Sequence, residues 1–154
     1  MPSTLQAAAD SLVTGPPSRT ASAASTLAEA LFATDAGPPP AERIAWLARD
    51  LDDFLAHAGT RAGVVFRLAL FAVSTIAPWF TGKLGPLRSL AVPERITALS
   101  RLERSPLGLT LFAVKAILCI LYYEHPDAAA EIGFDGTCLK GSARALPVLK
   151  GGDQ

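Results

Sequence analysis

Apolar and polar residues in this chain recur mostly with the three-to-four-residue spacing of an α-helix. Between residues 41 and 57, apolar side chains return at every third or fourth position, opposite a set of acidic and basic residues. Residues 93–103 show the same pattern, and a shorter apolar face begins at Thr26, which has the spacing of a capping box with Glu29. These three stretches predict amphipathic helices with one buried and one solvated face.

Two further stretches are apolar on nearly every side. Residues 64–76 contain a single charge, and residues 105–123 contain only Lys115. Ser105 followed by proline is typical of a helix start, and Pro126 cannot continue the helix. A helix that is apolar all round is buried in its own protein, in a partner or in lipid. We therefore expect the rest of the chain to be arranged around residues 105–136.

The five stretches together predict an all-α fold, a bundle of about five helices over residues 25–138. Residues 1–24 are rich in Ala, Ser, Thr and Pro and predict a flexible N-terminal tail, and residues 139–154 predict an extended C-terminal tail. A glycine-containing loop is expected at residues 81–90. Asp127 is expected to cap a short turn over residues 128–131 that ends at Gly133.

Composition narrows the possible functions. The 154 residues are half hydrophobic and 18% charged, with a mean hydropathy of +0.32, so one domain has ample material for a core. Fourteen basic residues balance fourteen acidic ones, which leaves no electrostatic footprint for nucleic acid. The N-terminus lacks the features of an export signal, so we expect a cytoplasmic protein that can associate peripherally with a membrane.

The two apolar helices raise the question of a membrane span. The longest uncharged run, residues 68–82, has about 15 residues and contains Pro78, short of the roughly 20 that a span needs. In residues 105–123, Lys115 costs roughly 3 kcal/mol, which nearly cancels the favourable apolar contributions. A bundle that buries both helices, or that lays one apolar edge on a membrane or partner, is favoured. Lys115 then either reaches the surface or pairs with a carboxylate, such as Asp135, Glu124 or one from another protein.

Candidate catalytic chemistry is sparse. The chain has only two histidines, His57 and His125, and no nucleophile elbow, phosphate-binding loop or zinc-protease motif. Cys119 and Cys138 have neither metal-ligand nor disulfide-framework spacing, and Cys119 is interpreted as a small core residue. The tripeptide at 125–127 is the His-Pro-Asp of J-domain co-chaperones, but its neighbours favour a structural corner. We expect no catalytic residue, metal or cofactor in this chain.

A series of short motifs carries a family resemblance. They are Leu-Ala-Glu-Ala-Leu at 27–31, Asp-Phe-Leu at 53–55, Pro-Glu-Arg at 93–95, the lysine-bearing helix ending in Tyr-Tyr, and Ile-Gly-Phe-Asp-Gly at 132–136. Over residues 26–138 the chain resembles the small helical subunit of glucose-methanol-choline flavin oxidoreductases of the gluconate-dehydrogenase type. It is similar, too, to the helical N-terminal region of long-chain fatty alcohol oxidases.

The resemblance implies a non-catalytic accessory subunit that stabilises a large FAD-containing partner and helps to shape its substrate entrance. FAD and the catalytic histidine belong to that partner. The family's twin-arginine signal is missing here, and the apolar helices suit a hydrophobic alcohol such as a steroid or long-chain alcohol. The residues that match the family, or that we expect at the partner interface, are Lys115, Tyr122, Tyr123, Gly133, Phe134, Gly136, Trp79 and Phe80.

Two other functions are compatible with the residues. One is a membrane-associated helical scaffold or anchor with no enzymatic role. The other is a small helical enzyme or lipid carrier, with a cavity between the helices at 64–76 and 106–123.

Overall fold

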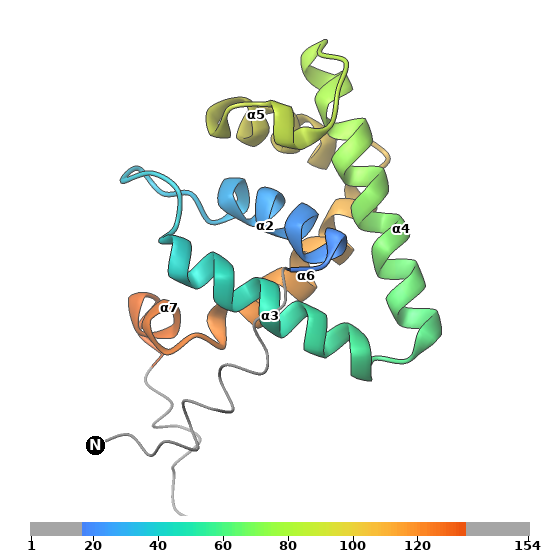
Figure 1. Cartoon of the computed structure of the whole chain (residues 1–154). Coiled ribbons are helices and arrows are strands. Elements are labelled where there is room, and N and C mark those ends of the chain that lie inside the picture. Colours follow the sequence, from blue (N-terminus) through green and yellow to red (C-terminus); the bar gives the residue numbers. More distant parts are fainter. Residues whose placement is uncertain (1–16, 135–154) are drawn as a thin grey trace, which may run out of the picture.

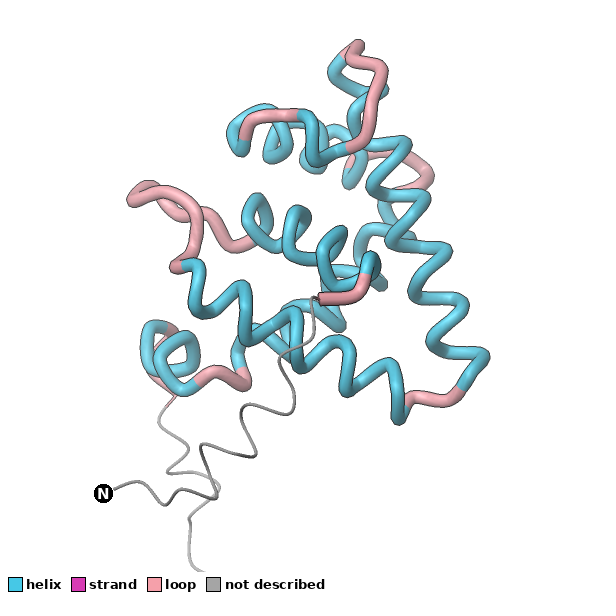
Figure 2. Tube along the Cα trace, viewed as in Figure 1, coloured by secondary structure: helices cyan, strands magenta, loops and turns pink. Residues whose placement is uncertain are grey.

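The computed structural model describes residues 17–134, and these residues form helices and connecting turns. Within them the only β pairing is an isolated bridge between Thr34 and Gly37, so the predicted all-α fold is confirmed (Figures 1 and 2). The elements are α2 (Arg19–Leu31), α3 (Ala41–His57), α4 (Thr60–Ile76), η1 (Ala77–Thr81), η2 (Leu87–Ser89), α5 (Val92–Glu103), α6 (Gly108–Tyr123) and α7 (Pro126–Glu131).

Helix α2 begins at Arg19, well before the predicted start at Thr26. Ser18 is the N-cap, because its hydroxyl accepts a hydrogen bond from the Ala21 N–H at 3.0 Å. Thr26 lies inside the helix and donates to the Ser22 carbonyl, so the predicted capping box is wrong. The part of the predicted tail between Arg19 and Ala24 is therefore helical. The other residues of the two predicted tails lie largely outside the described range.

This first helix occupies the centre of the fold. It contacts α3, α4, α5, α6 and η2, and Figure 1 shows it between α3, α4 and α5. Its inward positions are Ala21, Ala24, Leu27 and Ala28, all fully buried. Alanine side chains let neighbouring helices approach α2 closely from several directions, as close packing requires. Helix α6, within the predicted central stretch at residues 105–136, likewise contacts α2, α3, α4, α5 and α7, so α2 and α6 share the centre of the bundle.

Helix α3 has the predicted bounds and buries its apolar stripe of Ile44, Leu47, Leu51 and Leu55. Gly59 then turns the chain in the left-handed region, at φ 78°, which glycine adopts without steric cost. Helix α4 follows at Thr60, one turn before the predicted start, and its axis continues through the 3-10 helix η1. The loop predicted at residues 81–90 is broken by the short helix η2.

Helix α5 matches the prediction, but α6 starts at Gly108 instead of Ser105. The Ser105 hydroxyl accepts from the Leu107 N–H and donates to the Leu102 carbonyl, so it caps the turn between the two helices. A Cβ at Gly108 would lie 2.3 Å from the Glu103 carbonyl oxygen. Glycine is required there because the two chain segments cross too closely for a side chain.

The His-Pro-Asp tripeptide forms the corner between α6 and α7, in agreement with its structural interpretation. His125 caps α7, because its Nδ1 accepts from the Asp127 N–H at 3.3 Å, so the prediction that Asp127 is the cap is wrong. Gly133 ends α7 at φ 77° as predicted, and its N–H donates to the Ala130 carbonyl while that of Phe134 donates to Ala129.

Candidate interaction surface

Helix α4 is only half covered by the rest of the chain. Its inward side chains, Phe66, Leu70 and Val73, are buried in the core. Val65, Leu68 and Phe71 lie on the opposite side and are exposed, Phe71 by 67%. Their spacing of three residues keeps them together on the outer side of the helix. The outward side of α4 is therefore apolar where a helix of a soluble domain is normally polar.

Helix α6 repeats this arrangement. Leu111, Val114 and Leu118 are buried, whereas Leu109, Phe112 and Ile120 project outward, Leu109 with 77% of its surface exposed. The α4–α6 face denotes these six exposed side chains together: Val65, Leu68, Phe71, Leu109, Phe112 and Ile120. The two helices pack against each other, with α4 along the right edge of Figure 1 and α6 passing behind α2 and α3.

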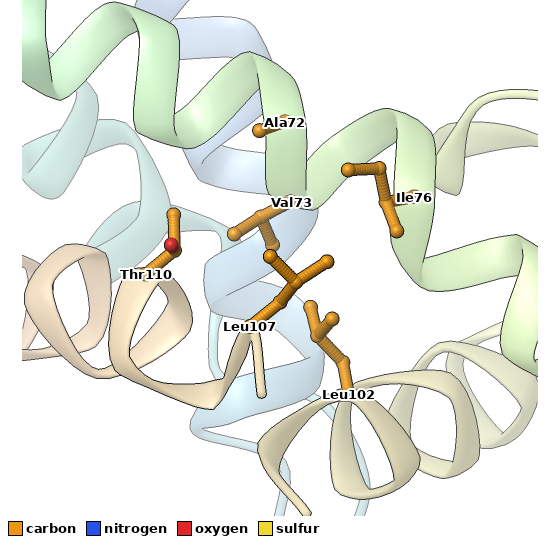
Figure 3. Close-up of a pocket in the computed structure, with 6 residues that line it drawn as sticks. All are labelled: Ala72, Val73, Ile76, Leu102, Leu107 and Thr110. Atoms are coloured by element: carbon orange, nitrogen blue, oxygen red, sulfur yellow. The ribbon is translucent and has the colours of Figure 1, made fainter. Parts of the chain in front are cut away.

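The seam between α4, α5 and α6 is tightly closed. Figure 3 shows Ala72, Val73 and Ile76 of α4 directed toward Leu107 and Thr110 at the start of α6, with Leu102 of α5 below. The cavity that they enclose has a volume of about 20 Å³, close to the minimum that holds one water molecule. The cavity predicted between these helices for a lipid carrier or small enzyme is therefore too small for such a ligand.

Lys115 reaches the surface and pairs there. Its side chain is 40% exposed, and its Nζ lies 3.4 Å from Glu103 Oε1 at the end of α5. Of the two expected partners, Glu124 is not the one observed, and Asp135 lies outside the described residues. The sequence missed Glu103 because the contact depends on how α5 and α6 fold back on each other. Arg67, the only charge predicted in residues 64–76, is exposed to solvent.

The predicted interface residues Tyr122 and Tyr123 occupy different environments. Tyr122 is only 4% exposed and stacks on Phe32 with 3.9 Å between ring centroids, so it supports the fold of this chain. Tyr123 is partly exposed and meets the edges of both rings. Burial raises the pKa of the Tyr123 hydroxyl, which keeps it neutral near pH 7.

An ion pair that the sequence analysis missed joins α3 to α7 beside Tyr122, at the end of α6. Both Arg43 guanidinium Nη atoms lie 2.7 Å from the Glu131 carboxylate, and one of them lies 3.5 Å from the Tyr122 hydroxyl. These hydrogen bonds raise the pKa of Arg43 and lower that of Glu131. The two residues are 88 positions apart, so no local pattern could have indicated the pair. It joins α3 to α7 across the aromatic cluster.

The remaining predicted interface residues lie at two places. Trp79 on η1 is exposed, while Phe80 packs partly against the core and its carbonyl accepts from Arg101. Gly133 and Phe134 are exposed at the end of α7. Gly136 lies outside the described residues. The structure thus does not gather the predicted residues into one patch, and the α4–α6 face contains none of them.

Candidate chemistry on the described residues is limited. No group of three His, Cys, Asp or Glu side chains that could hold a metal ion occurs between Pro17 and Phe134. Cys119 is half-buried in α6, and burial raises the pKa of its thiol. A raised thiol pKa lowers the thiolate fraction near neutral pH and makes the cysteine less nucleophilic. Cys138 lies outside the described residues.

One helix in the described part of the chain has the dimensions of a membrane span. Thr60–Thr81, comprising α4 and η1, is 22 residues long and apolar enough to cross a bilayer by length and composition. It is longer than the uncharged run noted in the sequence because Arg61 and Arg67 lie within the same continuous helix. One side of this helix packs on α2 and α6, as in a core helix.

Comparisons with known proteins found no match for this chain. No protein-family model matches it, and neither a curated protein nor a solved structure is similar to it.

Proposed function

We propose that this protein is a non-catalytic helical subunit that buries its α4–α6 face against a larger oxidoreductase chain. The exposure of six large apolar side chains on two helices of the core is the observation that supports this most strongly. Soluble helices normally carry polar residues on their outer side, and permanent interfaces resemble a domain core cut in half, so two adjacent helices with apolar outer residues are suited to such an interface.

The energetics are compatible with such a partner. Full burial of a large apolar side chain is worth roughly 1.5–3 kcal/mol, and these six are already partly covered, so the face contributes about 10 kcal/mol. Association itself costs about 4–15 kcal/mol, so polar contacts must add to the apolar ones. Arg61 and Arg67 are exposed on the same helix as Leu68 and can supply them.

The motif resemblance indicates the class of protein to which the partner belongs. On that basis the large chain is a FAD-containing oxidoreductase of the glucose-methanol-choline family that acts on a hydrophobic alcohol, such as a steroid or long-chain alcohol. FAD and the catalytic residues reside on that chain. The small chain stabilises it and helps to shape its substrate entrance.

Co-expression with a candidate flavoprotein of that family tests the proposal. We expect the full chain alone to aggregate and to carry no flavin, whereas co-expression yields a soluble yellow complex on size-exclusion chromatography. The double variant Leu68→Glu/Phe112→Glu should abolish the complex, because it places charges in the apolar contact. Arg49→Glu, on the exposed side of α3, is the matched control. A soluble lone monomer that turns over a substrate contradicts the proposal.

The second candidate function is a membrane-associated scaffold without an enzyme. It is favoured by one observation, the length and apolar character of Thr60–Thr81. Alkaline carbonate extraction of membranes separates the two functions, because an integral anchor stays in the pellet. A soluble subunit or a peripheral protein is released into the supernatant.

A further inference from the structure

A groove runs between α2, α4 and η2. Its volume is about 650 Å³, within the range of small-molecule sites in proteins. Helix α2 contributes Arg19 and Ser22, α4 contributes Phe71 and Ser74, and η2 contributes Leu87 and Arg88. None of these side chains takes part in the seam of Figure 3.

Among the described residues, Arg19 and Arg88 are the only charged side chains that line the groove. Neither forms an ion pair within residues 17–134. The neighbouring Arg95, which donates to the Arg88 carbonyl, is already paired with Glu29 at 2.6 Å.

Arg19 occupies the first position of α2. Ser18, the N-cap before it, donates from its N–H and its hydroxyl to the Asp52 carboxylate, so Asp52 already offsets the partial positive charge of that helix end. The charge that favours an anion in the groove is therefore that of the two guanidiniums.

The rest of the lining combines apolar and hydroxyl side chains. Its accessible apolar residues include Phe71, Ala23 and Pro86, whereas Leu87 is fully buried in the core. The hydroxyls of Thr26 and Thr75 donate to carbonyls of their own helices. The Ser74 hydroxyl oxygen is shielded from solvent and has no hydrogen-bond partner in the described structure.

We infer that the groove binds a small carboxylate with an apolar chain, in the manner of a medium-chain fatty acid. The two guanidiniums bind the carboxylate, for which their planar fork is well suited, and the chain lies along Phe71 and Pro86. This ligand goes beyond the proposed subunit function and does not depend on it. Because Phe71 also belongs to the α4–α6 face, a partner bound there would cover one end of the groove.

Calorimetric titration of octanoate into the full chain tests the inference. The chain is fused to a soluble carrier protein, and the carrier alone serves as the blank. We expect saturable binding of one octanoate, and binding of octanol, which has the same chain without the charge, at least about tenfold weaker. Arg19→Gln/Arg88→Gln should weaken octanoate binding about tenfold. Arg61→Gln, an exposed arginine of α4 outside the groove, should leave it unchanged.

Several results would overturn the inference. Absence of saturable octanoate binding removes the site, and equal affinity for octanol shows an apolar patch without charge recognition. Competition by inorganic phosphate at the same concentration as octanoate would show an anion site without an apolar requirement. If circular dichroism shows that the double variant is unfolded, the octanoate and octanol affinities of the unchanged chain decide the question. The co-expression result does not affect this test, because it reports on Leu68 and Phe112.

Discussion

Helices α2 and α6 show opposite relations between hydrophobicity and burial. Helix α2 is rich in Ala, Ser and Thr and has only two large apolar residues, Leu27 and Leu31, yet it contacts most other elements of the fold. Helix α6 is apolar along nearly its whole length, yet Leu109, Phe112 and Ile120 project into solvent. Apolar composition measures what a helix gains by burial, whereas small side chains decide how many neighbours fit around it.

This contrast explains why the α4–α6 face exists. The small side chains of α2 allow its neighbours to approach closely, so the core closes around α2 and the inner sides of α4 and α6, and the opposite sides of those two helices are turned outward. The outer residues of these helices do not contribute to the core formed by the described residues. Burial of these residues against a partner would stabilise a complex, and this is the basis of the proposed function.

The largest expected difference between α2 and α6 is in the free energy of unfolding after one leucine on each helix is replaced by alanine. Leu27→Ala in α2 leaves a cavity at a fully buried site and should reduce the free energy of unfolding by about 2–5 kcal/mol. Leu109→Ala in α6 should change it by less than about 0.5 kcal/mol, because that side chain is largely exposed. Urea denaturation followed by circular dichroism measures both. Similar losses in the two variants would contradict the difference in burial between these two sites.

Enlarging a small residue gives the converse test. Ala24→Leu places three extra carbons in a fully buried contact of α2 and should destabilise the fold by roughly 1–3 kcal/mol. Ala116→Leu on the exposed side of α6 should be neutral, since no neighbour resists the added volume. Thermal unfolding of the two variants distinguishes them. A stable Ala24→Leu protein would show that α2 is loosely packed.

The pH dependence of stability probes the pair that holds the end of α6. Hydrogen bonds from Arg43 lower the folded-state pKa of Glu131 below its ordinary 4.5. The contribution of this carboxylate is therefore complete above pH 4.5 and is lost as the pH falls through the lowered pKa. Glu131→Gln should remove that part of the acid sensitivity. Acid titrations of both proteins, monitored by tryptophan fluorescence, check this, and identical profiles would contradict it.

The smallest effect on the free energy of unfolding is expected from replacing Lys115, the only charged residue of α6. Lys115→Met removes a half-exposed pair with Glu103, and such pairs contribute about 0–1 kcal/mol. We expect unchanged folding in denaturant titrations of the full chain fused to a soluble carrier protein. Loss of the co-expressed complex in this variant, with folding intact, would instead show that Lys115 contacts a carboxylate of the partner.

Prediction from the sequence succeeded where the signal was local and failed where it was not. The bounds of α3 and α5 follow from their apolar spacing and adjoining prolines. The starts of α2 and α6 were misplaced although the cap of Ser18 on Ala21 and the turn made by Ser105 are local, because Thr26 and Ser105 carry cap-like patterns that the helices do not use. The α4–α6 face was harder to predict from the sequence, because a helix buried in its own protein and a helix that binds a partner have the same apolar pattern. The arginine groove had no sequence signal, since Arg19 and Arg88 are brought together by folding.

Helical spacing, chain-breaking residues and the balance of charge were enough to establish an all-α protein with two unusually apolar helices. These properties depend on interactions within a few residues, so they can be read along the chain. Which helix lies at the centre, which apolar side chains stay exposed and which ions pair depended on packing between distant segments. Ala24 and Phe112 illustrate the reason: the alanine is buried because neighbours fit around it, and the phenylalanine is exposed because none of the helices between residues 17 and 134 covers it.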